Sequence, residues 1–391
     1  MLIFPKDFEF EFDFDFKYFD FKNFVTKMTT TTKITTIGIL GAGQLARMLA
    51  LSGHPLGLRF VVLDPAPDAC AAAVSTHIIG NYDDREKLER FADMADVVTY
   101  EFENVPAESV AYLAERLPVY PSPKALAISR DRFTEKSLFV ELGIPTPKFL
   151  AVDNLDDLKR AVREIGLPAL LKTRTLGYDG KGQSVIKSND DIETAWTRAG
   201  GAACILEAFV PFTREISVVA VRDRAGEILF YPVGENTHSG GILRHTICRL
   251  GDPMQSAAET LARRLLEHFD YVGVLALELF DVDGKLTANE MAPRVHNTGH
   301  WSIEGAQTSQ FENHVRAVAG LPLGGTSAVC RSAMVNFIGT MPNAADVLRV
   351  NGAHLHDYGK APRPGRKLGH ATVCGESEEA AAGLGKLLEL L

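Results

Sequence analysis

The chain has 391 residues, of which 46% are hydrophobic and 23% charged, and its formal net charge is −9. These values describe an ordinary globular protein of two or three domains. The acidic balance argues against nucleic acid or an anionic membrane as the main partner, because either would require a basic face. The five cysteines form no C-x-x-C pair, which argues against a disulfide framework or a zinc site and favours a reducing cytoplasm. No apolar run approaches the ~20 residues that cross a bilayer.

Residues 1–33 differ from the rest of the chain. Phenylalanines alternate with acidic residues from position 8 to position 16, a strand-like pattern with no second strand nearby. The stretch lacks the apolar core and cleavage site of a signal peptide. We expect a disordered, non-functional extension ahead of a natural start near Met28, and the alternative is a strand that docks on the globular body.

Residues 34–128 alternate strand and helix patterns, which predicts a Rossmann-like, doubly wound parallel sheet. The first strand runs into Gly41 and Gly43, and Asp64 follows about 20 residues later, as in a dinucleotide-binding fingerprint. An NAD enzyme is therefore one interpretation. We favour the phosphate of another ligand at the N-terminus of the helix, since any such turn selects the same glycines. A purely structural turn is the third interpretation.

A proline-rich boundary precedes residues 129–325, where the pattern becomes strand-rich. Within it, residues 170–210 contain a strand, a glycine loop and a second strand, which predicts a hairpin lid. A further hairpin is expected to turn at Asp283-Gly284. Residues 326–391 form a small final unit, so the predicted fold class is α/β and α+β.

The glycine loop suits a cap over phosphates. Gly177, Gly180 and Gly182 allow close backbone approach, and Lys172 on the preceding strand supplies a cation. No Walker sequence is present, because Lys181 is followed by glycine and not by Ser or Thr. The alternative is a simple turn.

Two carboxylates of the second hairpin predict a metal site. Folding about Asp283-Gly284 brings Glu278 opposite Glu290, or one residue off, and facing carboxylates repel unless a cation lies between them. Mg²⁺ fits, with Asn289 as a neutral oxygen donor. Two solvated surface glutamates are the alternative.

Two polar segments follow the hairpin. Arg294 suits an anion ligand, whereas the spacing of His296 and His300 across a glycine suits no helical zinc pair. Further on, four basic residues concentrate in an acidic protein, as a phosphate clamp or as a solvated basic turn. They are Lys360, Arg363, Arg366 and Lys367.

Together, G-x-G-Q-L-x-R-M, Y-E-F-E-N, G-Y-D-G-K-G-Q, N-E-x-A-P-R-x-H-N-T-G-H-W and Y-G-K-x-x-R-P-G-R-K-x-G-H resemble the N5-carboxyaminoimidazole ribonucleotide synthetases. These are ATP-grasp ligases of purine biosynthesis, and the resemblance covers roughly residues 34–375. It implies a Rossmann-like domain, an ATP-grasp domain at 129–325 and a small C-terminal domain. Leu176 stands where the family commonly has glycine, and residues 1–33 have no counterpart.

The resemblance implies that ATP phosphorylates bicarbonate and that aminoimidazole ribonucleotide is then carboxylated on its exocyclic amine. ATP and Mg²⁺ are the implied cofactors, and a cytoplasmic homodimer is the implied form. The implied nucleotide contacts are Arg132, Lys172, Gly177, Tyr178, Asp179, Gly180, Lys181, Gly182, Gln183, Glu207, Ala208, Phe209, Val210, Glu215, His238, Asn289 and Glu290, with Glu278 and Glu290 as metal ligands. The implied catalytic residues are Tyr178, Asp179, Arg244 and Arg294, and the implied ribonucleotide contacts are Gln44, Leu45, Glu101, His296, Asn297, Lys360, Arg366 and Lys367.

Three other functions stay open. A nicotinamide oxidoreductase explains the first motif but leaves the paired carboxylates without a role. A non-catalytic nucleotide-binding module keeps the fold but does not need Glu278, Asn289 and Glu290. A different ATP-grasp ligase, such as a formate-dependent glycinamide ribonucleotide transformylase, is the closest alternative.

Asp179 lies in the middle of the predicted phosphate loop, where its charge would repel phosphate, so we expect it to face the amine of the second substrate. A carboxylate that accepts the amine proton is worth roughly 10²–10⁴-fold in rate. Asp179→Asn should therefore keep ATP binding and some bicarbonate-dependent ATP cleavage but lose carboxylation, whereas Lys172→Ala should lose both. ADP and carboxylated product are counted in one reaction. Product at near wild-type rate, or ATP binding as weak as in Lys172→Ala, would contradict this role.

Overall fold

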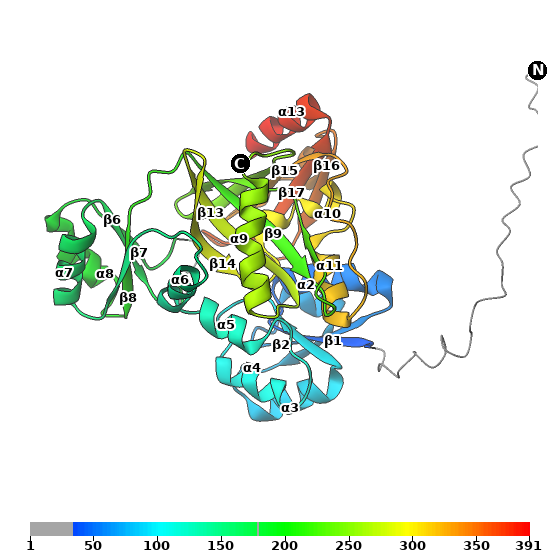
Figure 1. The fold of residues 1–391 in the computed structure, drawn as a ribbon. Helices are drawn as coiled ribbons and strands as arrows, with labels where there is room; N and C mark the ends of the chain where they lie inside the picture. The colour runs from blue at the N-terminus through cyan, green and yellow to red at the C-terminus, as the bar shows by residue number, and fades with distance from the viewer. Residues whose placement is uncertain (1–33, 178–179) are drawn as a thin grey trace, which may run out of the picture. The chain divides into compact units, whose positions relative to one another are not determined.

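The computed structural model describes residues 34–177 and 180–391, and these form three sheets with helices packed on them (Figure 1). The expectations for residues 1–33 concern residues outside the described part of the chain. Within the described residues, no helix is long and apolar enough to cross a membrane.

The first sheet is parallel and has the strand order β3-β2-β1-β4. This confirms the predicted Rossmann-like arrangement. The strand order reverses between β1 and β4, which are neighbours in the sheet. In sheets of this kind, ligands bind beyond the carboxyl ends of the two strands at that point. The elements are β1 (Thr36–Leu40), α2 (Gln44–Gly53), β2 (Arg59–Asp64), β3 (Thr76–Ile79), α3 (Arg85–Met94), β4 (Val97–Tyr100) and α4 (Ala107–Ala114).

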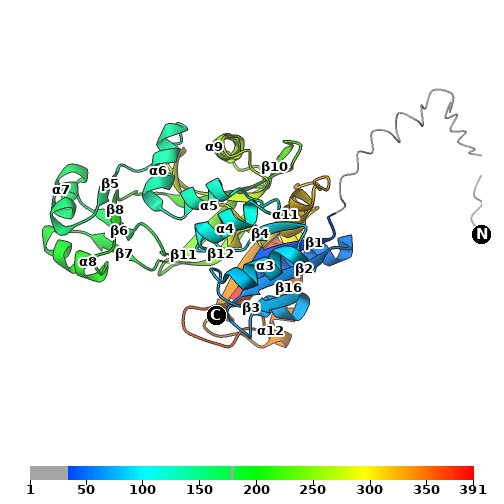
Figure 2. The ribbon, with the colours of Figure 1, turned by 90° about the horizontal axis from the view of Figure 1, so that it is seen from below.

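The second sheet is small, with the order β5-β8-β6-β7, and α7 and α8 cover it (Figure 2). Its β6 and β7 pair antiparallel, as the lid pattern predicts. Helices α5 and α6 lead into this part, and α6 follows Asp131, the N-cap residue, whose carboxylate accepts from the amides of Phe133 and Thr134. The elements are α5 (Pro123–Ser129), α6 (Arg132–Glu141), β5 (Phe149–Val152), α7 (Leu155–Ile165), β6 (Ala169–Thr173), β7 (Gln183–Ile186), α8 (Ile192–Arg198) and β8 (Cys204–Ala208).

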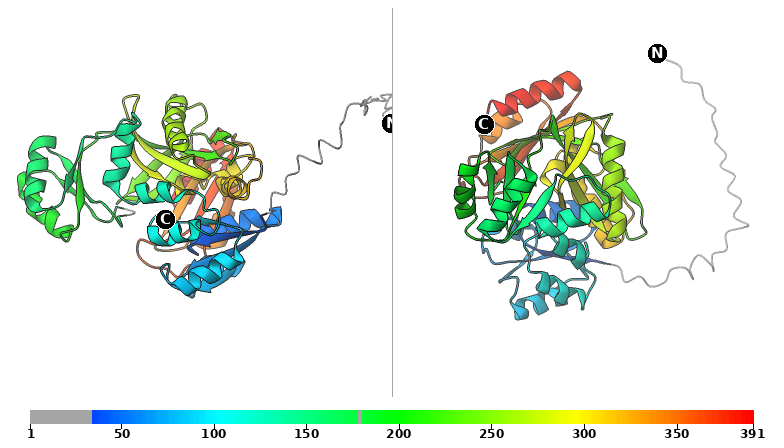
Figure 3. Two further views of the ribbon diagram at one scale, coloured as in Figure 1. Left: turned by 60° about the horizontal axis from the view of Figure 1, so that its bottom comes forward. Right: turned by 60° about the vertical axis from the view of Figure 1, so that its left-hand side comes forward.

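The third sheet has nine strands among the described residues, with β10 paired to β9 beside the path β14-β13-β9-β11-β12-β15-β17-β16. Its far end carries α13, which packs on β15 and β17 (Figure 3). The elements are β9 (Arg214–Arg222), β10 (Ile228–Phe230), β11 (Gly234–Ser239), β12 (Ile242–Cys248), α9 (Gln255–His268), β13 (Gly273–Val282), β14 (Lys285–Ala292), α10 (Ser302–Gly305), α11 (Gln310–Ala319), β15 (Arg331–Ile338), α12 (Ala344–Leu348), β16 (Ala353–Asp357), β17 (Lys367–Gly375) and α13 (Ser377–Leu388).

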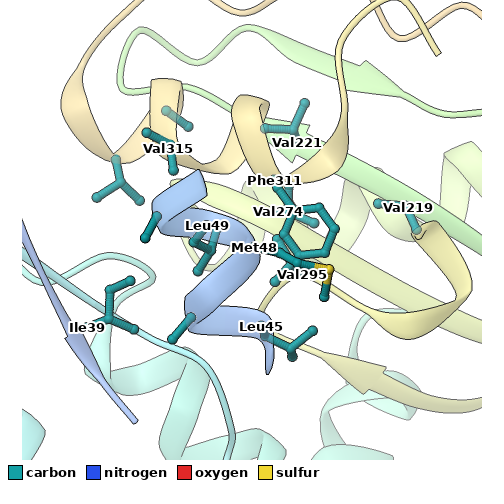
Figure 4. Close-up of a cluster of buried hydrophobic side chains, with 14 of the residues drawn as sticks. Ile39, Leu45, Met48, Leu49, Val219, Val221, Val274, Val295, Phe311 and Val315 are labelled. Atoms are coloured by element: carbon teal, nitrogen blue, oxygen red, sulfur yellow. The ribbon is translucent and has the colours of Figure 1, made fainter. Parts of the chain in front are cut away.

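Strands β9 and β13 are buried on both faces, because alternate residues enter different cores. Val219, Val221 and Val274 pack with α2 and α11 on one face (Figure 4). Val218 and Leu275 pack with α9 on the other. The sheet therefore connects the parallel domain to the rest of the chain and gives the site a rigid floor.

The β13–β14 hairpin forms as predicted. Asp283 and Gly284 both have positive φ, 50° and 80°, in the tight turn that such a dipeptide favours. Glu278 lies opposite Glu290, and a β-bulge follows, because Leu279 lies opposite Ala288. Asn289 is the extra residue of the bulge.

A fully buried histidine joins the parallel domain to the nine-stranded sheet. The amide of Val274 donates to Nδ1 of His314 over 3.1 Å, so Nε2 carries the proton and donates to Thr99 on β4 over 2.9 Å. Burial lowers the pKa of His314 to about 3. The folded protein thus keeps this side chain neutral where the unfolded chain binds a proton.

The free energy of unfolding should therefore decrease as the pH is lowered from the unfolded pKa of about 6.5 to the folded pKa of about 3. One such histidine contributes a slope of up to about 1.4 kcal/mol per pH unit. Glutamine at this position cannot titrate. In His314→Gln, the slope of the unfolding free energy against pH between about pH 6.5 and 4.5 should therefore be lower, by an amount equivalent to the uptake of at most about one proton on unfolding. Denaturant unfolding at several pH values measures it, and equal slopes in the two proteins would contradict the assignment.

Candidate functional site

A cavity of about 1140 Å³ lies between the three sheets. Among the described residues, ten Lys or Arg side chains and six Glu side chains line it, in a protein whose net charge is negative. It is therefore suited to anionic ligands. The predicted residues that line it are Gln44, Leu45, Glu101, Arg132, Lys172, Gly177, Gly180, Lys181, Gln183, Glu215, His238, Glu278, Asn289, Glu290, Arg294, His296, Asn297, Lys360, Arg366 and Lys367.

Glu278 and Glu290 face each other across the hairpin, and their pKa values are driven apart. Burial, and then the charge of Glu290, raises the pKa of Glu278 to about 7. Burial also opposes the ionisation of Glu290, but Arg132 outweighs it and lowers the pKa of Glu290 to about 2. Arg132 Nη1 lies 2.5 Å from Glu290 Oε2. Like charges are thus held together by a neighbouring cation.

Lys172 shares a buried carboxylate with a second lysine. Its Nζ lies 3.0 Å from Glu207 Oε2 and 3.5 Å from Asn289 Oδ1. Lys136 Nζ lies 3.6 Å from the same Glu207 oxygen. Burial opposes the ionisation of Glu207, but the two lysines outweigh it and lower its pKa. Two lysines thus share one carboxylate next to the hairpin.

His238 lies on the same side of the cavity as the hairpin. Its Nδ1 lies 2.8 Å from Glu215 Oε2. Burial would lower the pKa of His238, but the contact with Glu215 and the charge of Glu278 together raise it further than burial lowers it. The imidazole is thus biased toward the charged form, which suits a phosphate.

The glycines of the glycine loop are required for different structural reasons. Gly180 has φ 75°, and a Cβ there would lie 2.9 Å from Gly241 in the β11–β12 turn. A Cβ on Gly182 would meet Thr173, so this glycine serves the turn, and Gly182 does not line the cavity. Leu176 adopts φ 62° and is 67% exposed at the cavity. Tyr178 and Asp179 lie outside the described residues, so their roles stay predictions.

The N-terminus of α2 carries an internal anion. The Glu101 carboxylate accepts from the amide of Gly43 and, over 2.9 Å, from the amide of Ala46. A Cβ on Gly41 or Gly43 would lie within 2.7 Å of this side chain. The fingerprint glycines thus make room for Glu101, which occupies the amides of Gly43 and Ala46, and the expectation that a ligand phosphate binds at this helix N-terminus stays a prediction.

Asp64 is also occupied within the turn. Its Oδ2 accepts from the amide of Ala42 over 3.0 Å and from the Tyr82 hydroxyl over 2.8 Å. In a nicotinamide enzyme this carboxylate would bind a ribose. The geometry therefore gives the NAD interpretation no support.

Lysine and arginine side chains gather beside Glu101. Lys360 donates to Oε1 of Gln44, and burial lowers the pKa of this lysine. Arg366 and Lys367 line the same end of the cavity, which brings the predicted basic turn of the final unit onto the start of α2. Lys360 of this turn thus contacts a residue more than 300 positions away, and the role of the turn as a phosphate clamp stays a prediction.

Arg294 has a partner that the sequence reasoning missed. Its Nη2 lies 2.6 Å from Glu103 Oε1, and its Nη1 donates to the Val295 carbonyl over 3.0 Å. Its buried Nε has no hydrogen-bond partner among the described residues. His296 Nε2 lies 3.6 Å from Glu278 Oε1, and burial holds the pKa of His296 well below its usual value. Arg294 is thus oriented between the two ends of the cavity.

Several predicted residues do not line the cavity. Arg244 lies on β12, whose neighbouring residues Gly241, Ile242 and Leu243 do line it. The end of β8 and the residues after it, namely Glu207, Ala208, Phe209 and Val210, do not line it either. Glu207 reaches the site through Lys172, and the other roles stay predictions.

Glu135 and Lys136 were also missed. Both are buried, 2% and 1% exposed, although they are charged. Helical periodicity holds a signal, because Glu135 shares a face with the apolar Leu138 and Phe139. Phe212 and Phe280 were missed as well; their rings stack 4.7 Å apart at the cavity wall.

Three family models match consecutive parts of the chain. A ribonucleotide synthetase preATP-grasp domain matches residues 34–130 and an ATP-grasp domain matches residues 137–311. A phosphoribosylaminoimidazole carboxylase C-terminal domain matches residues 332–383.

Whole proteins are similar over the same range. The N5-carboxyaminoimidazole ribonucleotide synthase of Pseudomonas aeruginosa is 59% identical over 337 residues, which cover 86% of this chain and 94% of that protein. The crystal structure of the N5-carboxyaminoimidazole ribonucleotide synthetase from Thermus thermophilus is 53% identical, with a TM-score of 0.87 over 91% of this chain and 98% of that one. The Aspergillus clavatus synthase, solved with ADP and 5-aminoimidazole ribonucleotide, is 30% identical, with a TM-score of 0.86 over 92% and 98%.

Proposed function

The chain belongs to the N5-carboxyaminoimidazole ribonucleotide synthase family of ATP-grasp ligases, and we propose how its cavity divides the work of that reaction. The protein is an ATP-dependent carbon–nitrogen ligase that carboxylates 5-aminoimidazole ribonucleotide in purine synthesis. The observation that carries the division is that one cavity is lined both by the paired carboxylates of the hairpin, with Arg132 and Lys172, and by the basic residues Lys360, Arg366 and Lys367.

ATP binds at the hairpin end. Lys172, Arg132 and His238 supply positive charge for its phosphates, and the glycine loop covers them. Phosphoryl transfer depends mainly on positioning and charge neutralisation, which these groups provide. Glu207 to Val210 and Glu215 are the proposed contacts to adenine and ribose, on the strength of the family motif.

The residues at the hairpin fit Mg²⁺. Two carboxylates, Glu278 and Glu290, face each other, and the side-chain amide of Asn289 lies beside them, with Nδ2 3.5 Å from Glu278 Oε2 and Oδ1 3.5 Å from Lys172 Nζ. This is an all-oxygen donor set with repulsion for a cation to relieve. The described residues hold no cluster of three or more His, Cys, Asp or Glu suited to a metal, so phosphate oxygens and water would complete the coordination. When bound, the metal would neutralise charge on the transferring phosphoryl group.

Bicarbonate binds between the two ends, beside Arg294. The Arg294 guanidinium is held by Glu103 and by the Val295 carbonyl at the cavity wall, where its permanent positive charge suits an anion. ATP phosphorylates bicarbonate there, and the carboxyphosphate or the CO₂ that it releases meets the amine. Asp179 remains the proposed acceptor of the amine proton, and Arg244 a further anion ligand.

The ribonucleotide binds at the clamp. Lys360, Arg366 and Lys367 hold its phosphate, and Gln44 and Glu101 lie beside them to accept from the ribose hydroxyls. The Glu101 carboxylate on the α2 amides would repel a phosphate at that point. The phosphate therefore lies on the side chains and not on the helix N-terminus. We further propose that the enzyme works as a homodimer in the cytoplasm, as the family resemblance suggests.

A comparison of two reaction mixtures separates this function from the closest alternative. ADP and phosphate should be released with bicarbonate and aminoimidazole ribonucleotide, and not with formate and glycinamide ribonucleotide. Release with formate alone would overturn the assignment.

Glu290→Gln should abolish turnover and leave the fold intact, because an amide cannot balance Arg132 or bind a divalent cation as a carboxylate does. ADP release is measured at saturating magnesium, and the melting temperature checks the fold. Glu141→Gln, at an exposed position on α6, is the matched control and should behave as wild type. ATP hydrolysis by Glu290→Gln at the wild-type rate would show that the metal assignment is wrong.

A further inference from the structure

Two consecutive side chains of β14 face the cavity, although a regular strand would turn them to opposite faces. Asn289 and Glu290 both line the cavity. The bulge makes this possible, because Glu278 lies opposite Glu290 and Leu279 lies opposite Ala288, which leaves Asn289 without an opposite residue. A bulge is a common way to re-aim side chains beside a site.

The bulge lies on an edge strand, and α6 contacts its outer backbone groups. Lys136 Nζ donates to the Ala288 carbonyl over 3.0 Å, and the Met291 amide donates to Glu135 Oε1 over 2.7 Å. The Ala288 amide also points outward, to the Pro145 carbonyl at 2.7 Å. The two contacts therefore hold the backbone immediately before Asn289 and immediately after Glu290.

These two contacts are compatible only with the bulged register. Outward-facing backbone groups of a regular strand recur every second residue, so Ala288 and Met291, three residues apart, could not both face α6. The bulge adds the residue that turns both outward. A helix that binds both groups thus selects the bulge over the regular strand.

Packing alone does not explain why charged residues stand here. Glu135 and Lys136 are almost fully buried, and apolar side chains of similar size would fill the space without the cost of burying charge. Lys136 also lies near Glu207, and Arg132, one turn earlier on α6, pairs with Glu290. One helix face therefore contacts the hairpin backbone, a metal-binding side chain and the partner of Lys172.

We infer that Glu135 and Lys136 are positioning residues that hold the β14 bulge, so that Asn289 and Glu290 face the metal and nucleotide together. This inference rests on the proposed magnesium site. Neither residue needs to touch ATP or the ribonucleotide. Their effect passes through the backbone at Ala288 and Met291 and, for Lys136, also through Glu207.

The test compares Lys136→Met, Glu135→Leu and Glu135→Gln with the wild type. Lys136→Met keeps the length of the side chain without its charge and donor. Glu135→Leu removes the acceptor for the Met291 amide, whereas Glu135→Gln keeps an acceptor oxygen. Ser137→Ala is the control on the same helix, because this hydroxyl is exposed and its one hydrogen bond among the described residues goes to the Phe133 carbonyl.

Mn²⁺ binding in the presence of ADP is measured by titration calorimetry, together with kcat, the KM for aminoimidazole ribonucleotide and the melting temperature. Lys136→Met and Glu135→Leu should weaken Mn²⁺ binding by about tenfold or more, as loss of supporting contacts around metal ligands does. Both should lower kcat with little change in the KM for the ribonucleotide. Glu135→Gln and Ser137→Ala should bind Mn²⁺ as the wild type does.

Wild-type Mn²⁺ affinity and kcat in a folded Lys136→Met or Glu135→Leu protein would overturn the inference. A loss in Glu135→Gln as large as in Glu135→Leu would also overturn it, because the charge and not the acceptor would then matter. Should Lys136→Met fail to fold, the two Glu135 variants decide. Failure of the metal site itself is distinguishable, since Glu290→Gln would then retain Mn²⁺ binding.

Discussion

The site depends on two carboxylates that face each other across the β13–β14 hairpin. Glu278 and Glu290 repel each other, and the surrounding structure must supply positive charge to hold them. Arg132 does so from α6, and Lys172 lies next to Asn289 from the small sheet. The hairpin, α6 and the small sheet are thus joined by one electrostatic requirement. The same requirement makes the hairpin a place for a cation and for the phosphates that accompany it.

The parts of this arrangement that the sequence predicts are the local ones. Strand alternation and the Asp283-Gly284 turn predict the pairing of Glu278 with Glu290, because a tight turn sets the register. The glycine-rich stretch predicts the β6–β7 hairpin, and alternating elements predict the parallel sheet. Most of the residues that the family motifs single out line one cavity. For Tyr178 and Asp179 the prediction stays untested.

The parts that the sequence did not predict are those in which distant segments complete a local pattern. Gly41 and Gly43 are equally compatible with a bound phosphate and with a carboxylate of the protein. Glu101 lies there because it follows β4, which is the neighbour of β1 in the sheet. Glu135 and Lys136 were missed because charged residues are usually exposed, and their partners are backbone groups 152 to 156 residues away. The ion pair between Glu103 and Arg294 joins two segments that are far apart in the sequence, so no local pattern predicts it.

The carboxylate of Glu101 at the start of α2 also affects which metabolites can compete for the enzyme. A parallel sheet with this glycine pattern commonly accepts the pyrophosphate of a dinucleotide. Here the amides of Gly43 and Ala46 already bind an anion of the protein itself. A pyrophosphate at this point would have to displace a buried carboxylate, so the N-terminus of α2 is closed to a dinucleotide as long as Glu101 holds these two amides.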